Sequence, residues 1–220
     1  MGAWSTLRTQ IQLLSDDGTF ESSGALYNYL LPWANSIQLE VANEVDINHH
    51  LKTVEGDVTT DNHAWFLPDD YLKTSNRFTK VRVGDNYIDT IGFEDLNKLD
   101  ADHSEITTNT QPSYISIEGG VLYLYPKWAG TIVIENYIRR PVNMVEDTDV
   151  VDLPEDSIAD NLIIAGVVGK YCFPHLNEWE IAKTYYDKVG GSGRFFELMH
   201  DYKRYIGNTK TVWSNRGRYF

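Results

Sequence analysis

Cysteine is nearly missing from this sequence of 220 residues, with Cys172 as the single example. A lone cysteine excludes a disulfide within the chain and any metal site built from several thiolates. No hydrophobic run approaches the roughly 18 residues that a membrane-spanning helix needs. The first ten residues, MGAWSTLRTQ, lack the charged-then-apolar order of a signal peptide. We therefore expect a globular protein that is used in a reducing cytoplasm and has no membrane partner.

Motifs of the common enzyme classes are absent as well. The sequence contains no GxGxxG or GxxxxGK[ST] nucleotide loop, no GxSxG nucleophile elbow and no HExxH metal pair. The glycine-rich stretch at residues 190–193 lacks the lysine and the preceding strand that a phosphate-binding loop requires. We therefore expect no enzymatic activity, no catalytic residues, no cofactor and no metal.

A few side chains fit a catalytic or metal site only in isolation. The adjacent acids at 69–70 and 94–95 offer carboxylates like those of glycosidases, although a solvated acidic loop is the commoner setting for such pairs. The histidines at 49–50 are neighbours in sequence, so on a helix they would point about 100° apart and make poor co-ligands. Cys172 lies in an apolar helical pattern, which indicates packing rather than a nucleophile.

Charge is unevenly distributed along the chain. The net charge is −13, which argues against general nucleic-acid binding, because phosphate neutralisation needs lysine and arginine. From Lys203 onward the sequence has five basic residues and no acid, which leaves −18 on residues 1–202. A basic tail on an acidic body predicts that the tail docks on something acidic, for instance another copy of the body.

The strongest β pattern lies between Tyr114 and Pro141. β-Branched and aromatic residues fill the segments 114–117, 121–125 and 131–138, and glycine-containing turns separate them. Such residues favour strands, and glycine supplies the positive φ of a tight turn. The pattern predicts a meander of three consecutive strands with one buried face. The side chains expected in the core are Trp65, Leu67, Leu122, Leu124, Ile132 and Ile134.

Helical patterns flank the β region on both sides. Apolar residues recur at spacings of three and four over residues 26–45, where Pro32 is expected to kink or split the helix. Helical spacing resumes after residue 153 and continues, with breaks, to residue 206. Gly166 and Gly169 are small, so a second helix can approach closely there.

These patterns predict an α+β fold. We expect a helical bundle formed by residues 1–50 and 153–206, because each segment carries an apolar stripe that must be covered. A mainly antiparallel β-subdomain, residues 51–152, would be inserted into that bundle. Residues 207–220 have no helical or strand period, so they are expected to form an extended C-terminal arm.

Several aromatic and proline motifs follow one another in a familiar order. They are Trp65-Phe66-Leu67-Pro68, the stretch 122–126 followed by 137–141, and Leu153-Pro154-Glu155. In this order of elements the chain resembles the head-to-tail adaptor (connector) proteins of tailed bacteriophages, above all those of short-tailed phages. The similarity extends over residues 5–206.

The resemblance implies a structural protein of the virion neck that is assembled in the bacterial host cytoplasm and has no catalytic activity. Such adaptors form a ring, typically of twelve copies, that joins the portal protein to tail or nozzle proteins. Genomic DNA passes through the channel of the ring without specific binding. The basic arm is then the candidate contact to the portal or to a neighbouring subunit, through Lys210, Trp213, Arg216, Arg218, Tyr219 and Phe220.

A second interpretation is a carbohydrate- or protein-binding β-module of a phage tail or host surface apparatus. Trp128, Tyr123 and Tyr125 would then form a recognition face that stacks on sugars. The alternative is that these rings pack under the helices or against a neighbouring copy. A mass measurement separates a ring from a monomer that binds glycan.

Overall fold

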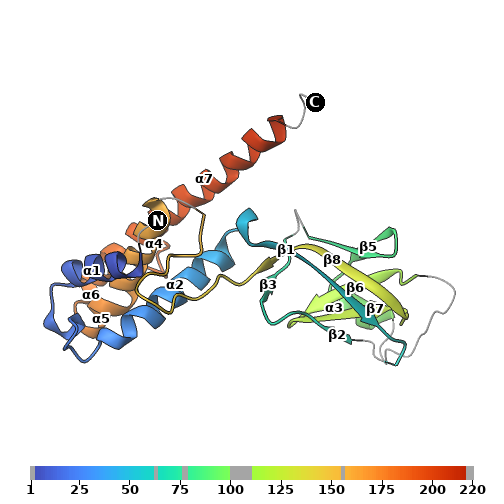
Figure 1. The fold of residues 1–220 in the computed structure, drawn as a ribbon, viewed down its shortest axis with the longest axis horizontal. Coiled ribbons are helices and arrows are strands. Elements are labelled where there is room, and N and C mark those ends of the chain that lie inside the picture. The colour runs from blue at the N-terminus through green and yellow to red at the C-terminus, as the bar shows by residue number, and fades with distance from the viewer. Residues whose placement is uncertain (1–2, 62–63, 76–78, 100–110, 155–156, 217–220) are drawn as a thin grey trace. The chain divides into compact units, whose positions relative to one another are not determined.

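A computed structural model describes residues 3–61, 64–75, 79–99, 111–154 and 157–216, with side chains as far as residue 206. The chain divides into two compact units (Figure 1). Unit 1 comprises Met1–His49 and Pro141–Phe220, and unit 2 comprises His50–Arg140. Helices make up most of unit 1 and strands most of unit 2. The expected combination of helices with a mostly antiparallel sheet is therefore confirmed.

Unit 1 is built from helices joined by short turns. Its α-helices are α1 (Trp4–Ser15), α2 (Leu30–Glu44), α4 (Ser157–Val167), α5 (Phe173–His175), α6 (Trp179–Tyr185) and α7 (Arg194–Arg216). Single 3-10 turns at Gly18–Phe20 and Tyr27–Tyr29 connect α1 to α2, and a third spans Asn48–His50. A π-helical turn at Val168–Cys172 connects α4 to α5.

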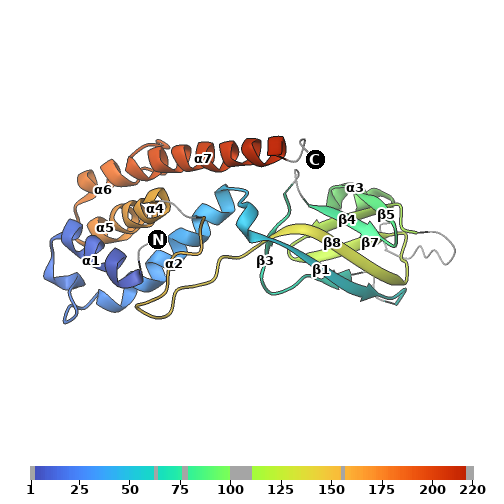
Figure 2. The same ribbon diagram turned by 45° about the horizontal axis from the view of Figure 1, so that its top comes forward.

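Helix α4 is the centre of unit 1. Every residue from Leu162 to Val167 is buried, as is typical of a helix enclosed by others. It packs against α1, α2 and α7 (Figure 2). A Cβ at Gly166 would lie 2.6 Å from Cγ2 of Ile37 in α2, and one at Gly169 would lie 2.6 Å from Cβ of Tyr185 in α6. The close approach of other helices that was expected at both glycines is confirmed.

Helix α2 begins later than its apolar stripe suggests. Tyr27–Tyr29 form a 3-10 turn and the α-helix starts at Leu30, so Pro32 lies in the first turn. A proline in the first turn loses no hydrogen bond, because the first amides of a helix have no partner within it. Pro32 therefore marks the start of α2 instead of kinking a longer helix.

Unit 2 is a curled sheet with one short helix. Its strands are β1 (Leu51–Val58), β2 (Ala64–Phe66), β3 (Tyr71–Lys73), β4 (Lys80–Val83), β5 (Asn86–Thr90), β6 (Tyr114–Glu118), β7 (Val121–Tyr125) and β8 (Gly130–Arg139). The order across the sheet is β1-β8-β4-β5-β6-β7-β2, and β3 also pairs with β8. The pairing of β5 with β6 is parallel and the other pairings of these strands are antiparallel. Helix α3 (Phe93–Leu99) follows β5.

The predicted meander is correct for its first two strands and wrong for the third. β6 and β7 form a hairpin, and Gly119 and Gly120 at its turn have φ of 57° and 81°. β8 instead lies between β1 and β4, where Ile134 faces Val54 on one side and Val81 on the other. In this position the ten residues of β8 form cross-strand side-chain pairs on both sides, and each such pair stabilises the sheet. Both partners, β1 and β4, come earlier in the chain, so the order of strands in the sequence does not predict this pairing.

The core of unit 2 lies on the inner face of the curled sheet. Its buried residues are Val58, Leu67, Val81, Val83, Ile115, Leu122, Leu124, Ile132, Ile134 and Tyr137. Five of the six side chains expected in this core are buried, and the sixth, Trp65, is half-buried and packs against the cluster.

Gly56 of β1 makes room for the ring of Trp65. A Cβ at residue 56 would lie 2.1 Å from Cζ2 of Trp65, closer than two carbons can approach without displacement. Gly56→Ala is therefore expected to lower the free energy of unfolding by about 1–3 kcal/mol, the usual cost of overpacking. Denaturant unfolding followed by tryptophan fluorescence measures this effect. Gly18→Ala is the control, because no atom lies within 4 Å of its added Cβ; equal losses in the two variants would contradict the steric account.

Candidate assembly surfaces

A groove of about 450 Å³ lies between α2 and α7 in unit 1. Leu39 of α2 and Phe195, Phe196 and Met199 of α7 supply its apolar side chains. The α7 residues follow at spacings of three and four, so one face of the helix contributes to both the core and the groove. The other lining residues are Ser36, Glu40, Asn43, Glu44, Lys170, Lys188 and Lys203.

Glu40 organises one wall of this groove. Its carboxylate accepts a hydrogen bond from Nζ of Lys170 at 2.7 Å and another from the hydroxyl of Tyr186. Burial raises the pKa of Tyr186, and the bond to Glu40 raises it further. Burial lowers the pKa of Lys170, but the hydrogen bond and charge of Glu40 outweigh it, so that pKa is raised. Near neutral pH both groups therefore stay protonated and hold Glu40 in place.

The lining of the groove is net positive, in contrast to the acidic chain as a whole. Lys203 pairs with Glu44 at 3.1 Å and Lys170 pairs with Glu40. Lys188 is exposed and makes no ion pair with the described residues. Three lysines against two glutamates favour an acidic occupant over a basic one.

The segment 141–152, between β8 and α4, is fixed to the side of α2 although it has no regular secondary structure. Asn35 donates to the carbonyl of Met144 and accepts from its amide, both at 2.9 Å. Gln38 donates to the carbonyl of Val142 at 2.8 Å and accepts from the amide of Asp152 at 2.7 Å. The course of the segment beside α2 is visible in Figures 1 and 2. Two side-chain amides thus fix the segment to α2 at residues 142, 144 and 152.

Further contacts fix the acidic part of this segment. Asp147 receives two bonds from the guanidinium of Arg8, at 2.6 and 3.0 Å, which lower the pKa of the carboxyl. Asp149 accepts from the amides of Glu146 and Val145, at 2.9 and 2.7 Å, which lower its pKa as well. These carboxylates therefore remain charged at neutral pH.

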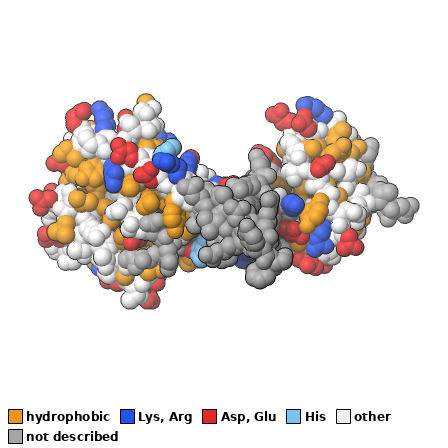
Figure 3. Space-filling model, turned by 90° about the horizontal axis from the view of Figure 1, so that it is seen from above, with side chains coloured by type: hydrophobic (Ala, Val, Ile, Leu, Met, Phe, Trp, Pro, Cys, Tyr) orange, Lys and Arg blue, Asp and Glu red, His pale blue; other side chains and the backbone are white. Residues whose placement is uncertain are grey.

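The outer face of the segment carries three exposed valines among polar and acidic residues. Val142 is 64% exposed, Val145 74% and Val150 44%. Met144 and Val151, by contrast, are buried and anchor the segment from below. Hydrophobic side chains also lie among charged ones on the face of unit 1 shown in Figure 3. Because the backbone of the segment is fixed, these three exposed valines make it a candidate interaction surface.

The predicted partner-binding residues lie at the end of α7 or beyond it. Helix α7 continues to Arg216, so the prediction of an extended arm is wrong for residues 207–216. The physical reason is cooperativity: residues 195–206 pack α7 onto unit 1, and each further residue then adds one hydrogen bond without a new nucleus. Of the six residues, Lys210, Trp213 and Arg216 belong to α7, with side chains outside the described set. Arg218, Tyr219 and Phe220 lie outside the described residues.

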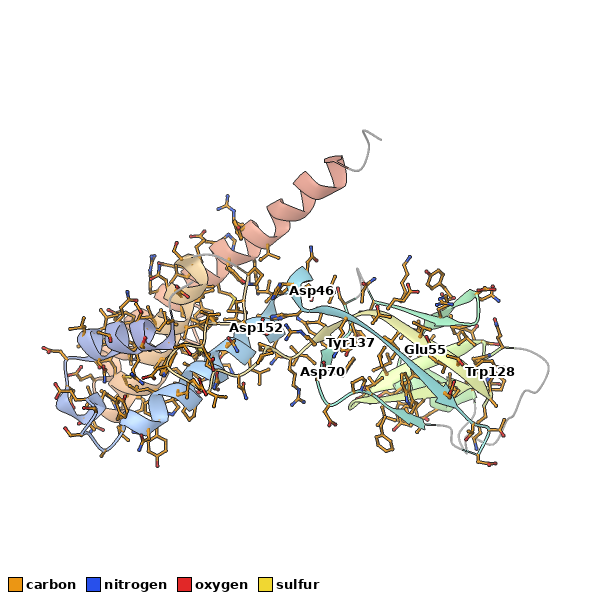
Figure 4. All side chains as sticks on the ribbon, viewed as in Figure 1. Asp46, Glu55, Asp70, Trp128, Tyr137 and Asp152 are labelled. Carbon is orange, nitrogen blue, oxygen red and sulfur yellow. The ribbon has the colours of Figure 1, made fainter. Side chains whose placement is uncertain are left out.

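In each acidic pair considered for catalysis, one carboxylate is bonded to a neighbouring side chain of unit 2. Asp70 accepts from Nζ of Lys52 at 2.6 Å and from the hydroxyl of Tyr137 at 2.8 Å (Figure 4). Burial alone would raise the pKa of Asp70, but these two bonds lower it overall. Asp95 pairs with Lys98 at 2.7 Å on the surface of α3.

Cys172 and His49 lie in unit 1, and His50 is the first residue of unit 2. Cys172 is buried, and burial raises the pKa of its thiol to about 12, so it is no thiolate nucleophile at neutral pH. Nε2 of His49 lies 3.4 Å from Asp152, while His50 is buried. Within the described residues, no group of three or more histidine, cysteine or acidic side chains could hold a metal ion.

Two of the three aromatic side chains considered for sugar stacking, Trp128 and Tyr123, are engaged in packing within unit 2. Trp128 packs against the core cluster, and its ring occupies the space beside Gly130 (Figure 4). Tyr123 contacts Phe93 of α3, with ring centroids 4.7 Å apart. These contacts favour the packing alternative for both rings.

The groove and the valine-bearing segment were not predicted as functional sites from the sequence. Lys170 and Tyr186 follow Glu40 by more than a hundred residues in the sequence. The three side chains meet only in the fold. The valines at 142, 145 and 150 within an acidic stretch were a visible signal, since apolar residues without a period do not build a helix or strand.

The fold and its surfaces can be compared with known proteins. No curated protein matches the chain. In the part of the chain that the structure describes, no helix has the length and apolar character needed to cross a membrane. The family model of the SU10 adaptor protein matches residues 3–192, which include all of unit 2 and most of unit 1. The resemblance to phage head-to-tail adaptors is thereby confirmed, and the chain belongs to the SU10 adaptor protein family.

Proposed function

We propose that this adaptor forms a ring, typically of twelve copies, that joins the portal protein to the tail in the neck of the virion. The observation that carries this proposal is the family match over residues 3–192. On this proposal the tail-side partners are tail or nozzle proteins, as in short-tailed phages. The role is assembly, without catalysis.

The charge of the chain supports a ring around a DNA channel. Residues 1–202 carry a net charge of −18. Binding to DNA depends on neutralising phosphates with lysine and arginine, which an acidic lining does not do. DNA would therefore slide through such a ring without being held.

The end of α7 is the proposed contact to the portal or to the adjacent subunit. The sequence from Lys203 onward carries +5 and ends in aromatic residues, while the rest of the chain is acidic. Arginine and aromatic residues dominate the energetics of many protein interfaces. On this proposal α7 presents Lys210, Trp213 and Arg216 from a helix, and Arg218, Tyr219 and Phe220 follow it.

The test is docking of the purified chain onto its portal, followed by mass measurement and imaging. The full chain is expected to add a ring of subunits to each portal. A chain that lacks residues 208–220 should keep its melting temperature but dock more weakly, and raised salt should weaken docking of the full chain because exposed ion pairs are screened. The control is the double variant Lys98→Gln and Lys183→Gln, which removes two exposed cations elsewhere.

Two results would contradict the proposal at different points. A full chain that adds no ring to the portal would exclude the adaptor ring itself. A truncated chain that docks as tightly as the full chain would exclude the end of α7 as the anchor, while the ring could stand.

A further inference from the structure

We infer that the groove between α2 and α7 of one copy receives the 141–152 segment of the neighbouring copy. This inference rests on the proposed ring. Identical subunits close into a ring through heterologous contacts, in which two different surfaces of each subunit are complementary. The groove and the segment are two such surfaces on unit 1.

The two surfaces match in apolar character. The segment holds Val142 and Val145 in solvent at 64% and 74% exposure. The groove offers Leu39, Phe196 and Met199 within a volume of about 450 Å³, which is in the range of pockets that enclose small molecules. Seating the valines in the groove removes apolar area from water on both sides, which favours association.

The two surfaces also match in charge. Residues 141–152 contain four acids and no basic residue, and they remain net negative although Arg8 pairs with Asp147. The groove has a net positive lining, and its exposed Lys188 makes no ion pair with the described residues. Complementary charges steer the two surfaces together and disfavour docking of the basic end of α7 in this groove.

The arrangement around α2 makes the contact intermolecular. Asn35 and Gln38, which hold the segment, lie on one side of α2, and the α2 residues that line the groove lie on another. At 100° per residue the two sets point roughly 140° apart. The segment is fixed by the bonds of both amides, so it does not reach the groove of its own chain. Each copy thus offers a segment on one side of α2 and a groove on the other.

The first test replaces the most exposed valine. Val145→Lys brings a cation to a net positive groove and is expected to raise the concentration needed for ring assembly by about tenfold or more. Leu13→Lys is the matched control, because Leu13 is also 74% exposed and lies in unit 1. Both variants should melt like the unaltered chain, since neither side chain is buried. Lys188→Glu should weaken assembly, and combining it with Val145→Lys should restore part of the loss.

The second test is a disulfide between copies. Asn43→Cys places a thiol in the lining of the groove and Val145→Cys places one on the segment, while native Cys172 is buried. Under oxidation the double variant is expected to give a ladder of linked subunits when rings are present. The pair Asn43→Cys with Leu13→Cys should give none.

The outcomes separate this inference from the proposed function. Rings that form equally well with Val145→Lys, or that give no ladder with the cysteine pair, would overturn the inference and leave the ring intact. Equal loss of assembly with Leu13→Lys would overturn it too. A native chain that stays monomeric, both alone and with its portal, would refute the ring and with it the inference.

Discussion

Ile134→Asp is expected to unfold unit 2. Ile134 is fully buried on β8, where it faces Val54 of β1 and Val81 of β4. Within the core cluster around it, the described side chains are apolar apart from the hydroxyl of Tyr137, which bonds to Asp70. A carboxylate at residue 134 would therefore be buried without a partner, at a cost of about 4 kcal/mol or more.

Hydrogen exchange of peptides from β8, together with denaturant unfolding, measures this loss within unit 2. Ile134→Val is the control for shape, with an expected cost of about 1 kcal/mol. Leu13→Asp is the control for charge, because it adds the same group at a side chain that is 74% exposed. An unchanged unfolding midpoint for Ile134→Asp would mean that this face of the sheet is open to solvent.

Gln38→Leu is expected to release the 141–152 segment and to destabilise unit 1. Gln38 is fully buried, and its amide bonds to the carbonyl of Val142 and the amide of Asp152. Leucine has a similar size but leaves both backbone groups without this partner. Each unsatisfied group costs about 1–3 kcal/mol, so the total loss for the two groups should be about 2–6 kcal/mol.

The free energy of unfolding and the rate of proteolysis within residues 141–152 both measure this effect. Gln10→Leu is the matched control, because Gln10 is exposed on α1. Gln38→Glu is a second variant, which keeps the acceptor for Asp152 but loses the donor to Val142. If Gln38→Leu and Gln10→Leu were equally stable and equally resistant to protease, the segment would not depend on Gln38.

The parts of the fold that were predictable depend on local pattern. Alternation in 114–125 predicts the β6–β7 hairpin, and Gly166 with Gly169 predicts the close helix packing that the structure has. The placement of β8 between β1 and β4 was not predictable, because partner choice depends on contacts far apart in sequence.

Like the placement of β8, the candidate surfaces depend on contacts between residues far apart in sequence. The apolar positions of α7 were visible as a helical pattern, but which side of the helix meets α2 depends on the whole of unit 1. The helical course of residues 207–216 was missed because their own sequence has no apolar period and the helix is started by the packing of earlier residues.

The split of unit 1 in the sequence has a consequence for synthesis on the ribosome. Helices α1 and α2 are made first, but α4, which covers them, follows only after all of unit 2 has been translated. At 5–20 residues per second the intervening 50–140 stretch takes on the order of ten seconds. During that interval the apolar faces of the nascent α1 and α2 are without their native cover, while unit 2, which is continuous in sequence, has emerged and can fold. We therefore expect chaperones to bind the N-terminal helices of this adaptor, rather than unit 2, during translation.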